Sequence, residues 1–295
     1  MRVLILGTAG MLGHKLWQLL GKQFDVVGTV RGSFEPYARY GIYDRDRLIG
    51  GIDAQDFDSV IRAVAEARPD TVINCIGIIK QLPSAHDPVL SISVNSLFPQ
   101  RLGRLCQAAQ ARLMHISTDC VFNGRKGMYT EDDPSDAEDL YGRTKYLGEV
   151  SGSNCLTLRT SIIGRELATT SGLVEWFLSN DGGKVRGYTN AIYSGFTTNA
   201  LSHVIADLID SKSDLSGLYQ VSSDPINKFE LLRLLRKAYE VNLEIEPYAD
   251  LAIDRSLDST RFRELTGFAP PSWAEMITDM ASDNTPYQEW RTKKL

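Results

Sequence analysis

The stretch MRVLILGTAGMLGHKLWQLL, residues 1–20, decides the fold. Its first six residues predict a buried strand, and an apolar-periodic helix follows over residues 12–20. Between them, Gly7, Gly10 and Gly13 have a G-x-x-G-x-x-G spacing. Glycines in this place let the backbone approach a pyrophosphate, which the helix N-terminus attracts with its amides and partial positive charge. We therefore expect a dinucleotide-binding turn; the alternative is a tight turn with a purely structural role.

Strands and helices alternate from this turn to about residue 160. We expect strands at 24–30, 48–52, 72–75, 113–117 and 154–159, and helices at 57–67, 89–109 and 140–150. This alternation predicts an α/β fold with a doubly wound parallel sheet, a Rossmann fold. Pro99 predicts a kink or a break in its helix. Residues 32–49 have no clear period and are expected to be irregular.

The pattern changes after residue 160. We expect helices at 174–178, 198–209 and 229–239, and extended pieces at 184–194, 217–221 and 243–247. The first 160 residues are predicted to form an NAD(P)-binding domain, to which residues from about 195 to 225 return. Most of residues 161–295 are predicted to form a smaller C-terminal substrate-binding lobe.

Composition and charge narrow the class of protein. Of the 295 residues, 43% are hydrophobic and 23% are charged, as in an ordinary globular protein. The net charge of −5 gives no general attraction for nucleic acid or anionic membranes. No apolar run approaches the roughly 20 residues that span a bilayer. We therefore expect neither a nucleic-acid nor a membrane partner.

The four cysteines and four histidines are scattered without metal-site spacing, so we assign no metal. Cysteines without pair spacing favour a reduced, cytoplasmic protein. We expect Cys75, Cys106 and Cys155 to be small buried side chains, and His115, inside a strand, to be buried structure. Cys120 differs, because it lies in the stretch that carries the candidate chemistry.

That stretch is ISTDCVFNG, residues 116–124, followed by DLYGRTKYLGE, residues 139–149. On a helix, Tyr141 and Lys145 share one face, one turn apart. A phenol titrates near pH ~10, and a neighbouring ammonium lowers that pKa towards neutrality. Thr118, at a strand tip, has a hydroxyl suited to hold a carbonyl beside the phenol. The three groups predict protonation of an oxygen while a hydride reaches its carbon. A Tyr–Lys pair also arises by chance on helices, and the glycine turn upstream favours the catalytic interpretation.

Polar residues at the other strand ends are candidate cofactor ligands. Arg31 ends the second strand and suits a 2′-phosphate, which favours NADP; the alternative is a solvated surface charge. Gly77 lets the chain pass close to a flat ligand, unless it serves a turn with positive φ. Asn95, inside a helix, makes either a buried hydrogen bond or none.

Together these motifs resemble the extended short-chain dehydrogenase/reductase family, and most of all its dTDP-4-dehydrorhamnose reductases. The residues that carry the resemblance are GTAGMLG at 7–13, Asp53, STDCVFNG at 117–124, the acidic stretch 129–134, YGRTKYLGE at 141–149, LRT at 158–160 and DRSLDSTRF at 254–262. The resemblance spans nearly the whole chain, and its first half is the more specific.

The resemblance implies reduction by NADP(H), or alternatively NAD(H), of the C4 ketone of a nucleotide-linked 4-keto-6-deoxy sugar. Tyr141 would donate the proton, Lys145 would lower its pKa and bind the nicotinamide ribose, and Thr118 would orient the carbonyl. Asp53 would lie near the adenine, and Asn95 would support Lys145. The implied cofactor contacts are Gly7, Thr8, Gly10, Met11, Leu12, Gly13, Arg31, Asp53, Asn74, Cys75, Gly77, Asn95, Tyr141 and Lys145.

Candidate substrate contacts are Lys80, Asp119, Cys120, Val121, Trp176 and Arg255. Cys120 replaces the aromatic residue usual in the family, so the wall beside the sugar differs. Trp176 suits stacking on a base but also suits a core position. Arg255 and Arg261 are either diphosphate ligands or surface ion-pair partners. Some family members dimerise through magnesium held by glutamates; Lys15 is in that region here, and a homodimer of another kind stays open.

Three other functions are alternatives to the reductase. The related 4,6-dehydratases resemble Thr-Asp-Glu at the first catalytic position, whereas Cys120 follows Asp119 here, so dehydration lacks its base. A sugar-nucleotide epimerase with a retained cofactor needs no new residue type. A non-catalytic regulatory subunit would keep the nucleotide fold without turnover.

Overall fold

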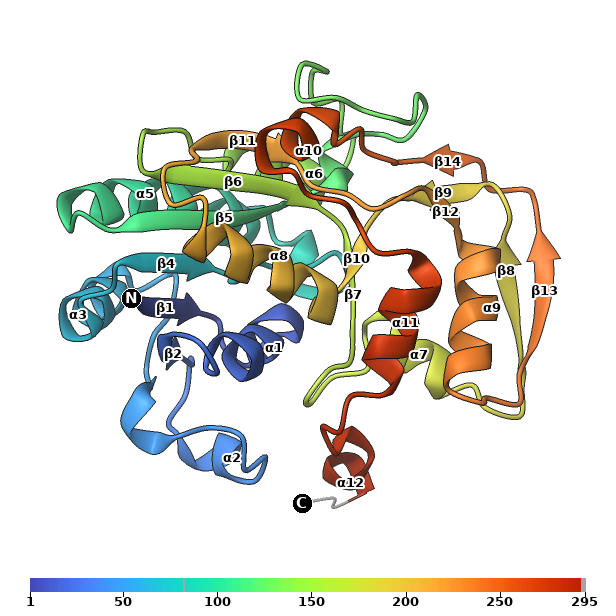
Figure 1. Cartoon of the computed structure of the whole chain (residues 1–295), viewed down its shortest axis with the longest axis horizontal. Helices are drawn as coiled ribbons and strands as arrows, with labels where there is room; N and C mark the ends of the chain where they lie inside the picture. The colour runs from blue at the N-terminus through green and yellow to red at the C-terminus, as the bar shows by residue number, and fades with distance from the viewer. Residues whose placement is uncertain (82, 293–295) are drawn as a thin grey trace.

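The computed structural model describes residues 1–81 and 83–292. Seven parallel strands form the central sheet, in the order β11-β6-β5-β4-β1-β2-β3 (Figure 1). Their bounds are β1 Arg2–Leu6, β2 Asp25–Thr29, β3 Leu48–Ile49, β4 Thr71–Asn74, β5 Arg112–Thr118, β6 Cys155–Thr160 and β11 Gly217–Gln220. The strand order reverses between β1 and β4, so a crevice opens at their carboxyl ends. The predicted doubly wound parallel sheet is confirmed.

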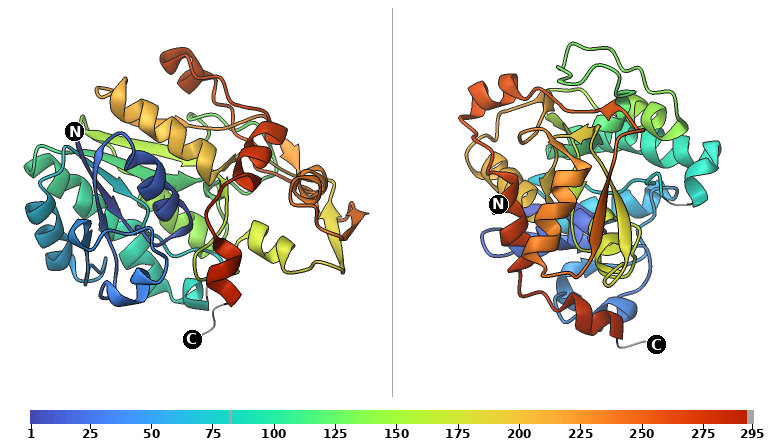
Figure 2. Two further views of the ribbon diagram at one scale, coloured as in Figure 1. Left: turned by 60° about the horizontal axis from the view of Figure 1, so that its bottom comes forward. Right: turned by 90° about the vertical axis from the view of Figure 1, so that its right-hand side faces the viewer.

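Helices cover both faces of the sheet because its strands are apolar on both sides. In β1, Val3 and Ile5 belong to a core cluster that contains α1 (Met11–Leu20) and α8 (Thr198–Asp210). The alternate residues Leu4 and Leu6 belong to a second cluster with α3 (Phe57–Ala67) and α5 (Phe98–Ala108). This alternation along a strand produces the three layers seen in Figure 2.

A smaller lobe lies beyond the carboxyl ends of the strands, on the right in Figure 1. Its strands are β7 Ile162–Ile163, β8 Lys184–Tyr188, β9 Ala191–Tyr193, β10 Phe196–Thr197, β12 Ile226–Asn227, β13 Glu244–Tyr248 and β14 Ile253–Asp254. Its helices are α7 Leu173–Leu178, α9 Lys228–Ala238 and α11 Trp273–Ala281, with α12 Tyr287–Thr292 below them, whereas α10 Thr260–Thr266 lies against β11 of the central sheet. Between the segments of the lobe in the chain, α8 packs against the central sheet and β11 pairs with β6 at its edge.

Some predicted boundaries were wrong. The third strand stops at Ile49 instead of residue 52, because Gly51 has a left-handed φ of +71°. The region 32–49 is not wholly irregular: it contains the short helix α2 (Glu35–Ala38) and a 3₁₀ turn at Arg45–Arg47. The helix that carries Tyr141 and Lys145, α6 (Leu140–Leu147), ends three residues earlier than predicted, at a glycine C-cap.

The helix predicted at 89–109 has a wide turn instead of a kink. It consists of α4 (Pro88–Ser91), a π-helical segment (Ile92–Leu97) and α5. Pro99 is the second residue of α5 and has no N–H to donate to the carbonyl of Asn95, and its ring would crowd that carbonyl in a regular helix. The backbone therefore widens just before the proline.

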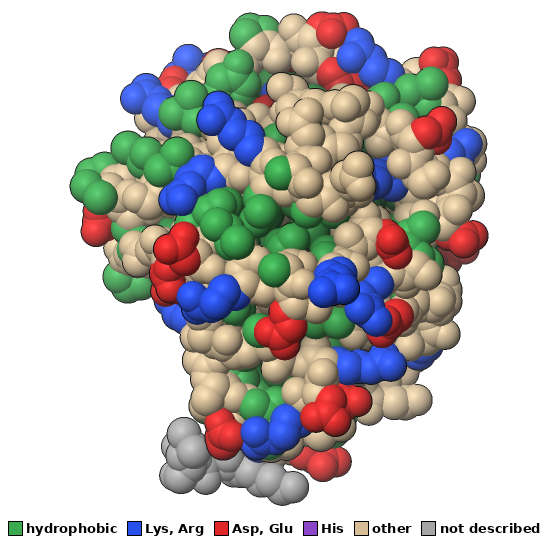
Figure 3. Space-filling view, turned by 90° about the vertical axis from the view of Figure 1, so that its left-hand side faces the viewer, with side chains coloured by type: hydrophobic (Ala, Val, Ile, Leu, Met, Phe, Trp, Pro, Cys, Tyr) green, Lys and Arg blue, Asp and Glu red, His purple; other side chains and the backbone are tan. Residues whose placement is uncertain are grey.

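The surface on the amino-end side of the sheet mixes charges of both signs. Figure 3 shows Lys and Arg side chains interspersed with Asp and Glu, around a group of hydrophobic side chains. Within residues 1–81 and 83–292, every helix is too short or too polar to cross a bilayer.

Candidate active site

The glycine turn connects β1 to α1 at the switch point of the sheet. Gly7 has a φ of +82°, and a Cβ on Gly13 would lie 2.2 Å from the Gly7 carbonyl oxygen. These two glycines are therefore required by the turn itself. Gly10 is exposed and N-caps α1 without any side-chain cap. The first amides of α1 consequently remain available to an anion.

Two of the predicted cofactor contacts in this turn have buried side chains. Thr8 is fully buried, and its hydroxyl donates to the Ile5 carbonyl and accepts from the Thr29 amide. Leu12 packs in the core. If these two residues contact the cofactor, they do so through their backbone atoms, and their assignment stays a prediction.

Arg31 and Asp53 meet beyond the carboxyl ends of β2 and β3. The Arg31 Nε and Asp53 Oδ2 atoms are 3.6 Å apart, and 78% of the Arg31 side chain is exposed. Because its pairing is loose and solvated, the guanidinium can turn to a phosphate. Neither residue lines the crevice that Thr118, Tyr141 and Lys145 share.

Two buried asparagines hold the loop after β4. The Asn74 side-chain oxygen accepts from the Ile76 amide, and its NH₂ is 3.1 Å from His115 Nδ1. The Asn95 side-chain oxygen accepts from the Ile78 amide at 2.9 Å, and its NH₂ donates to the Ile78 carbonyl. Asn95 therefore makes the buried hydrogen bonds that were one of its two interpretations. Its NH₂ also lies 3.4 Å from the Thr144 hydroxyl, next to Lys145 in the chain, and its predicted support of that lysine stays a prediction.

The catalytic candidates face one crevice, whose volume is about 270 Å³. Thr118 ends β5, while Tyr141 and Lys145 lie one turn apart on α6. Of the other predicted site residues, those that line the same crevice are Met11, Asn74, Cys75, Gly77, Lys80, Asp119 and Cys120. Gly77 does not have a positive φ, so a turn that needs one is excluded. The other interpretation, that Gly77 lets the backbone pass close to a flat ligand, stays a prediction.

Helix α6 begins where Asp139 caps it, and a glycine brings it close to β5. The Asp139 carboxylate accepts from the Gly142 amide at 2.8 Å and forms an ion pair with Lys80 at 2.5 Å. A Cβ on Gly142 would lie 2.2 Å from the Cys120 carbonyl oxygen. Only a glycine lets α6 pack this tightly on the turn after Thr118, and this packing sets Tyr141 against that turn.

Burial is the largest influence on the pKa values of the two catalytic candidates on α6. It lowers the pKa of Lys145 to about 8, while the charges of Glu149 and Cys75 act in the opposite direction. Burial raises the pKa of Tyr141, an effect that nearby anionic groups reinforce and a hydrogen bond from Thr118 opposes. The expected lowering of the phenol pKa by Lys145 is not observed, since the Lys145 ammonium donates instead to the Ile116 carbonyl at 2.7 Å. Burial therefore favours the protonated phenol of Tyr141 and brings the pKa of Lys145 closer to neutrality.

The substrate candidates separate into those at the crevice and those elsewhere. Burial raises the pKa of Asp119, against the attraction of Arg255. Arg255 donates to the Phe122 carbonyl at 2.8 Å and so braces the turn that carries Asp119 and Cys120. Val121 was predicted wrongly, because it is fully buried in a small core with Phe122, Tyr129 and Leu257.

Two further candidates lie outside the crevice. Trp176 is 39% exposed on α7 and does not line it, so the core interpretation was also wrong. Arg261 forms an ion pair with Asp132 at 2.7 Å. It therefore fits the second of its two interpretations, that of a surface ion-pair partner.

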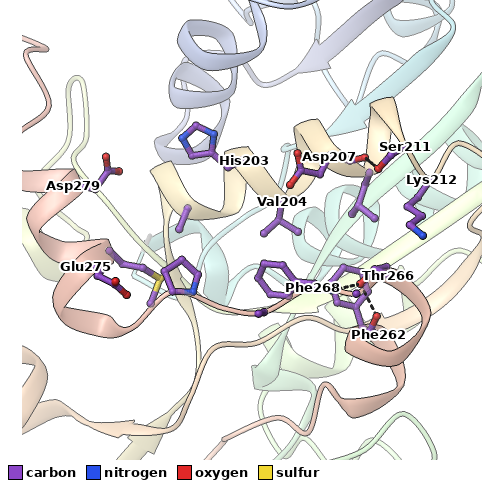
Figure 4. A pocket seen from close by; sticks show the side chains of 16 residues that line it. His203, Val204, Asp207, Ser211, Lys212, Phe262, Thr266, Phe268, Glu275 and Asp279 are labelled. Carbon is purple, nitrogen blue, oxygen red and sulfur yellow. Dashed lines mark hydrogen bonds between the residues drawn. The ribbon is translucent and has the colours of Figure 1, made fainter.

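A larger cavity, of about 570 Å³, lies between α8, α10 and α11 (Figure 4). Figure 4 shows His203 and Asp207 on α8, and Phe262 and Phe268 on the opposite side. The cavity contains none of the predicted catalytic or cofactor residues, and Asp207, Glu275 and Asp279 line it. Lys212 also lines this cavity, but the three carboxylates outnumber it and disfavour an anionic dinucleotide or sugar diphosphate, so the smaller crevice is the candidate active site.

Comparison with known proteins shows the family of the chain. Residues 1–285 match the family model of the RmlD substrate binding domain. The chain belongs to the RmlD family. The predicted resemblance is thereby confirmed.

Individual relatives of this RmlD-family chain share about a third of its residues or fewer over the aligned part. It is 36% identical over 149 residues to the dTDP-4-dehydrorhamnose reductase of Streptomyces griseus, an alignment that covers 50% of this chain and only 43% of that protein. It is 27% identical over 233 residues to a probable low-salt glycan biosynthesis reductase of Haloferax volcanii, covering 76% and 75% of the two chains.

Solved structures give the same fold. The dTDP-4-dehydrorhamnose reductase of Bacillus anthracis, in complex with NADP, has a TM-score of 0.77 at 22% identity, over 95% of this chain and 98% of that chain. An enzyme described as a hypothetical dTDP-4-dehydrorhamnose reductase from Sulfolobus tokodaii has a TM-score of 0.76 at 25% identity, over 92% and 98%.

The sequence analysis did not identify several residues that shape or line the candidate site. Asp139 stands just before the apolar helix, which is the signature of an N-cap, so it was recognisable. Gly142 gave no signal, because its need depends on the Cys120 carbonyl of another element. Ser161 and Gly172 line the crevice from the lobe side, and no local pattern marks them.

Proposed function

We propose that the protein catalyses the NADPH-dependent reduction of the C4 ketone of a nucleotide-linked 4-keto-6-deoxy sugar. The observation that carries the proposal is the meeting of Thr118, Tyr141 and Lys145 in one crevice beside the switch point of the sheet. The relatives named dTDP-4-dehydrorhamnose reductase support this class of substrate.

The residues present fit a dinucleotide. The uncapped first turn of α1 suits the pyrophosphate, and the exposed Arg31 guanidinium suits the 2′-phosphate of NADP. Met11, Cys75 and Gly77 flank the crevice at the ends of β1 and β4. We therefore propose NADP(H) as the preferred cofactor, with NAD(H) as the weaker ligand.

Tyr141 acts as the general acid in this proposal. The bound NADPH supplies the hydride for the carbonyl carbon. The Tyr141 hydroxyl gives its proton to the carbonyl oxygen, so that the ketone becomes a secondary alcohol. The Thr118 hydroxyl donates a hydrogen bond to the same oxygen and orients it. The Lys145 ammonium stabilises the resulting tyrosinate, to which water returns a proton.

The direct test is the oxidation of NADPH, followed by its absorbance, with a panel of nucleotide 4-keto-6-deoxy sugars. We expect turnover with dTDP-4-dehydrorhamnose and its loss in Tyr141→Phe. Turnover restricted to a ketone on another nucleotide would keep the chemistry and change the substrate. NADPH binding without any oxidation would contradict the reductase and favour the epimerase or the regulatory subunit.

We further propose that the protein is a cytoplasmic homodimer. All four cysteines are free thiols, which suits a reducing compartment. Val89 and Ile92 are exposed on α4 and the π-helical segment, and Tyr146 and Leu147 are exposed on α6, which contacts both. Such adjoining apolar side chains suit a second copy of the chain. Light scattering should give twice the mass of the chain, and a monomer mass for Leu147→Lys.

A further inference from the structure

The segment 283–291, here called the C-terminal strap, connects the two halves of the molecule. It leaves the lobe at the end of α11, crosses beside α1 and returns to the lobe through α12. Figures 1 and 2 show α12 between α2 on one side and α7 on the other. The proposed mechanism uses none of the residues of this segment.

On the side of the dinucleotide turn, the strap is anchored to α1. The Asp283 carboxylate pairs with the ammonium of Lys15, a side chain only 3% exposed. The Lys15 ammonium also donates to Gln18 at 2.7 Å, and Gln18 donates to Thr285. This ion pair joins residues that are 268 positions apart in the chain.

A histidine extends the anchor into the glycine turn. The fully buried His14 places Nδ1 2.9 Å from the Gly10 carbonyl and Nε2 2.7 Å from the Tyr287 hydroxyl. A carbonyl can only accept, so Nδ1 carries the hydrogen, and Nε2 accepts from Tyr287. The strap thus holds the imidazole that holds Gly10, the exposed glycine of the turn.

On the side of the substrate lobe, the strap is anchored at the rim of the crevice. The Arg291 guanidinium pairs with the buried Glu175 carboxylate and donates to the Glu166 carbonyl at 2.6 Å. The Glu166 carboxylate in turn accepts from the Gly172 amide at 2.8 Å. Gly172 lines the crevice, so a continuous series of contacts runs from the dinucleotide turn to the substrate rim.

We propose that the strap fixes the glycine turn and the Gly172 rim relative to each other, so that the dinucleotide and the sugar nucleotide strengthen each other's binding. The inference rests on the proposed function. The ligand that binds first orders both walls of the crevice, and the second ligand then finds them already ordered. Linkage requires the effect to be reciprocal. Tyr287 and Arg291 are positioning residues, since they act through His14 and Glu166.

The test measures the Kd of NADPH in the absence and presence of saturating dTDP. We expect dTDP to tighten NADPH binding about fivefold or more in the natural protein, the lower end of ordinary coupling. In Tyr287→Phe and Arg291→Gln the ratio of the two Kd values should approach one. The Kd of dTDP, measured with and without NADPH, should change by the same factor.

Two features keep this test interpretable. Tyr287→Phe removes one hydroxyl and keeps the ring contacts with His14 and Trp290, so the fold should survive. Arg233→Gln removes an exposed ion pair with Glu230 on α9, away from the strap, and should keep the natural ratio. A ratio of one in the natural protein, or an unchanged ratio in both strap variants, would overturn the inference. Failure to bind NADPH at all would instead contradict the proposed function, and this inference with it.

Discussion

Two clusters of buried charged side chains differ in how their charges are paired. In the crevice, Lys145 donates to a backbone carbonyl and burial lowers its pKa to about 8. In the strap, burial alone would raise the pKa of Asp283, but its bonds with Lys15 and Thr285 outweigh burial and lower that pKa to about 2. A buried ionisable group without a counter-ion titrates near neutrality and suits proton chemistry, whereas a paired one keeps its charge and fixes structure.

The largest effect, on kcat, should come from removing the hydroxyl of Tyr141, the proposed general acid of the crevice. Tyr141→Phe should lower kcat by about 10²–10⁴-fold, the usual contribution of a positioned general acid, while the Kd of NADPH changes little. Stopped-flow turnover and equilibrium titration measure the two quantities. Tyr146→Phe, on the exposed side of the same helix, is the control and should keep full activity. Equal kcat in both variants would remove Tyr141 from the mechanism.

Breaking the pairing in the strap should affect stability instead. Asp283→Asn leaves the Lys15 ammonium buried and unpaired, so unfolding should become easier by about 3 kcal/mol. Urea unfolding at neutral pH measures this, with Asp250→Asn, an exposed carboxylate in the loop after β13, as the control.

The same ion pair also predicts a pH dependence of stability. Because folding depresses the pKa of Asp283 from 3.8 to about 2, its contribution is present above pH 4 and is lost as the pH falls towards 2. Asp283→Asn should be less sensitive to acid over this window. Identical acid unfolding of the variant and the natural protein would contradict the pairing.

A smaller effect should appear in the pH profile of kcat. If the Lys145 ammonium stabilises the tyrosinate, kcat should fall up to tenfold per pH unit above its pKa of about 8. Tyr141 keeps its proton over this range, since burial raises its pKa. Lys145→Arg retains its charge at higher pH, so any activity left in that variant should lose the alkaline limb. If kcat of Lys145→Arg still falls above about pH 8 as in the natural protein, another group is responsible for that fall.

The smallest effect should lie at the exposed edge of the site. Arg31→Gln should raise the Kd of NADPH roughly threefold to tenfold and leave that of NADH unchanged, because a solvated guanidinium contributes little. Isothermal titration with both cofactors measures the difference. Arg45→Gln, another exposed arginine in an ion pair, provides the matched control. Equal losses for both cofactors would mean that Arg31 does not contact a 2′-phosphate.

Most of the fold was predictable because its signals are local. The strand, glycine turn and helix at the N-terminus lie within 20 residues, and the alternation of apolar runs indicated the parallel sheet. The π-helical segment before Pro99 was not predictable, because a proline can be accommodated by a kink, a break or a wide turn, and packing selects among them.

The candidate site was predictable only in part. Tyr141 and Lys145 share a helix face, so their spacing was informative. The side-chain directions of Thr8, Val121 and Trp176 were not, since each depends on what packs against it: the sheet, a small core or open solvent.

The sequence by itself determined the glycine turn after β1 and the helix that carries Tyr141 and Lys145, because helix periodicity and glycine turns depend on a few neighbouring residues. Only the tertiary structure decided that β4 lies beside β1, that Gly142 presses α6 against the Cys120 carbonyl, and that Tyr287 reaches His14 across 273 positions. Such contacts join residues that are far apart in the chain, and no local pattern of residues in the sequence indicates them.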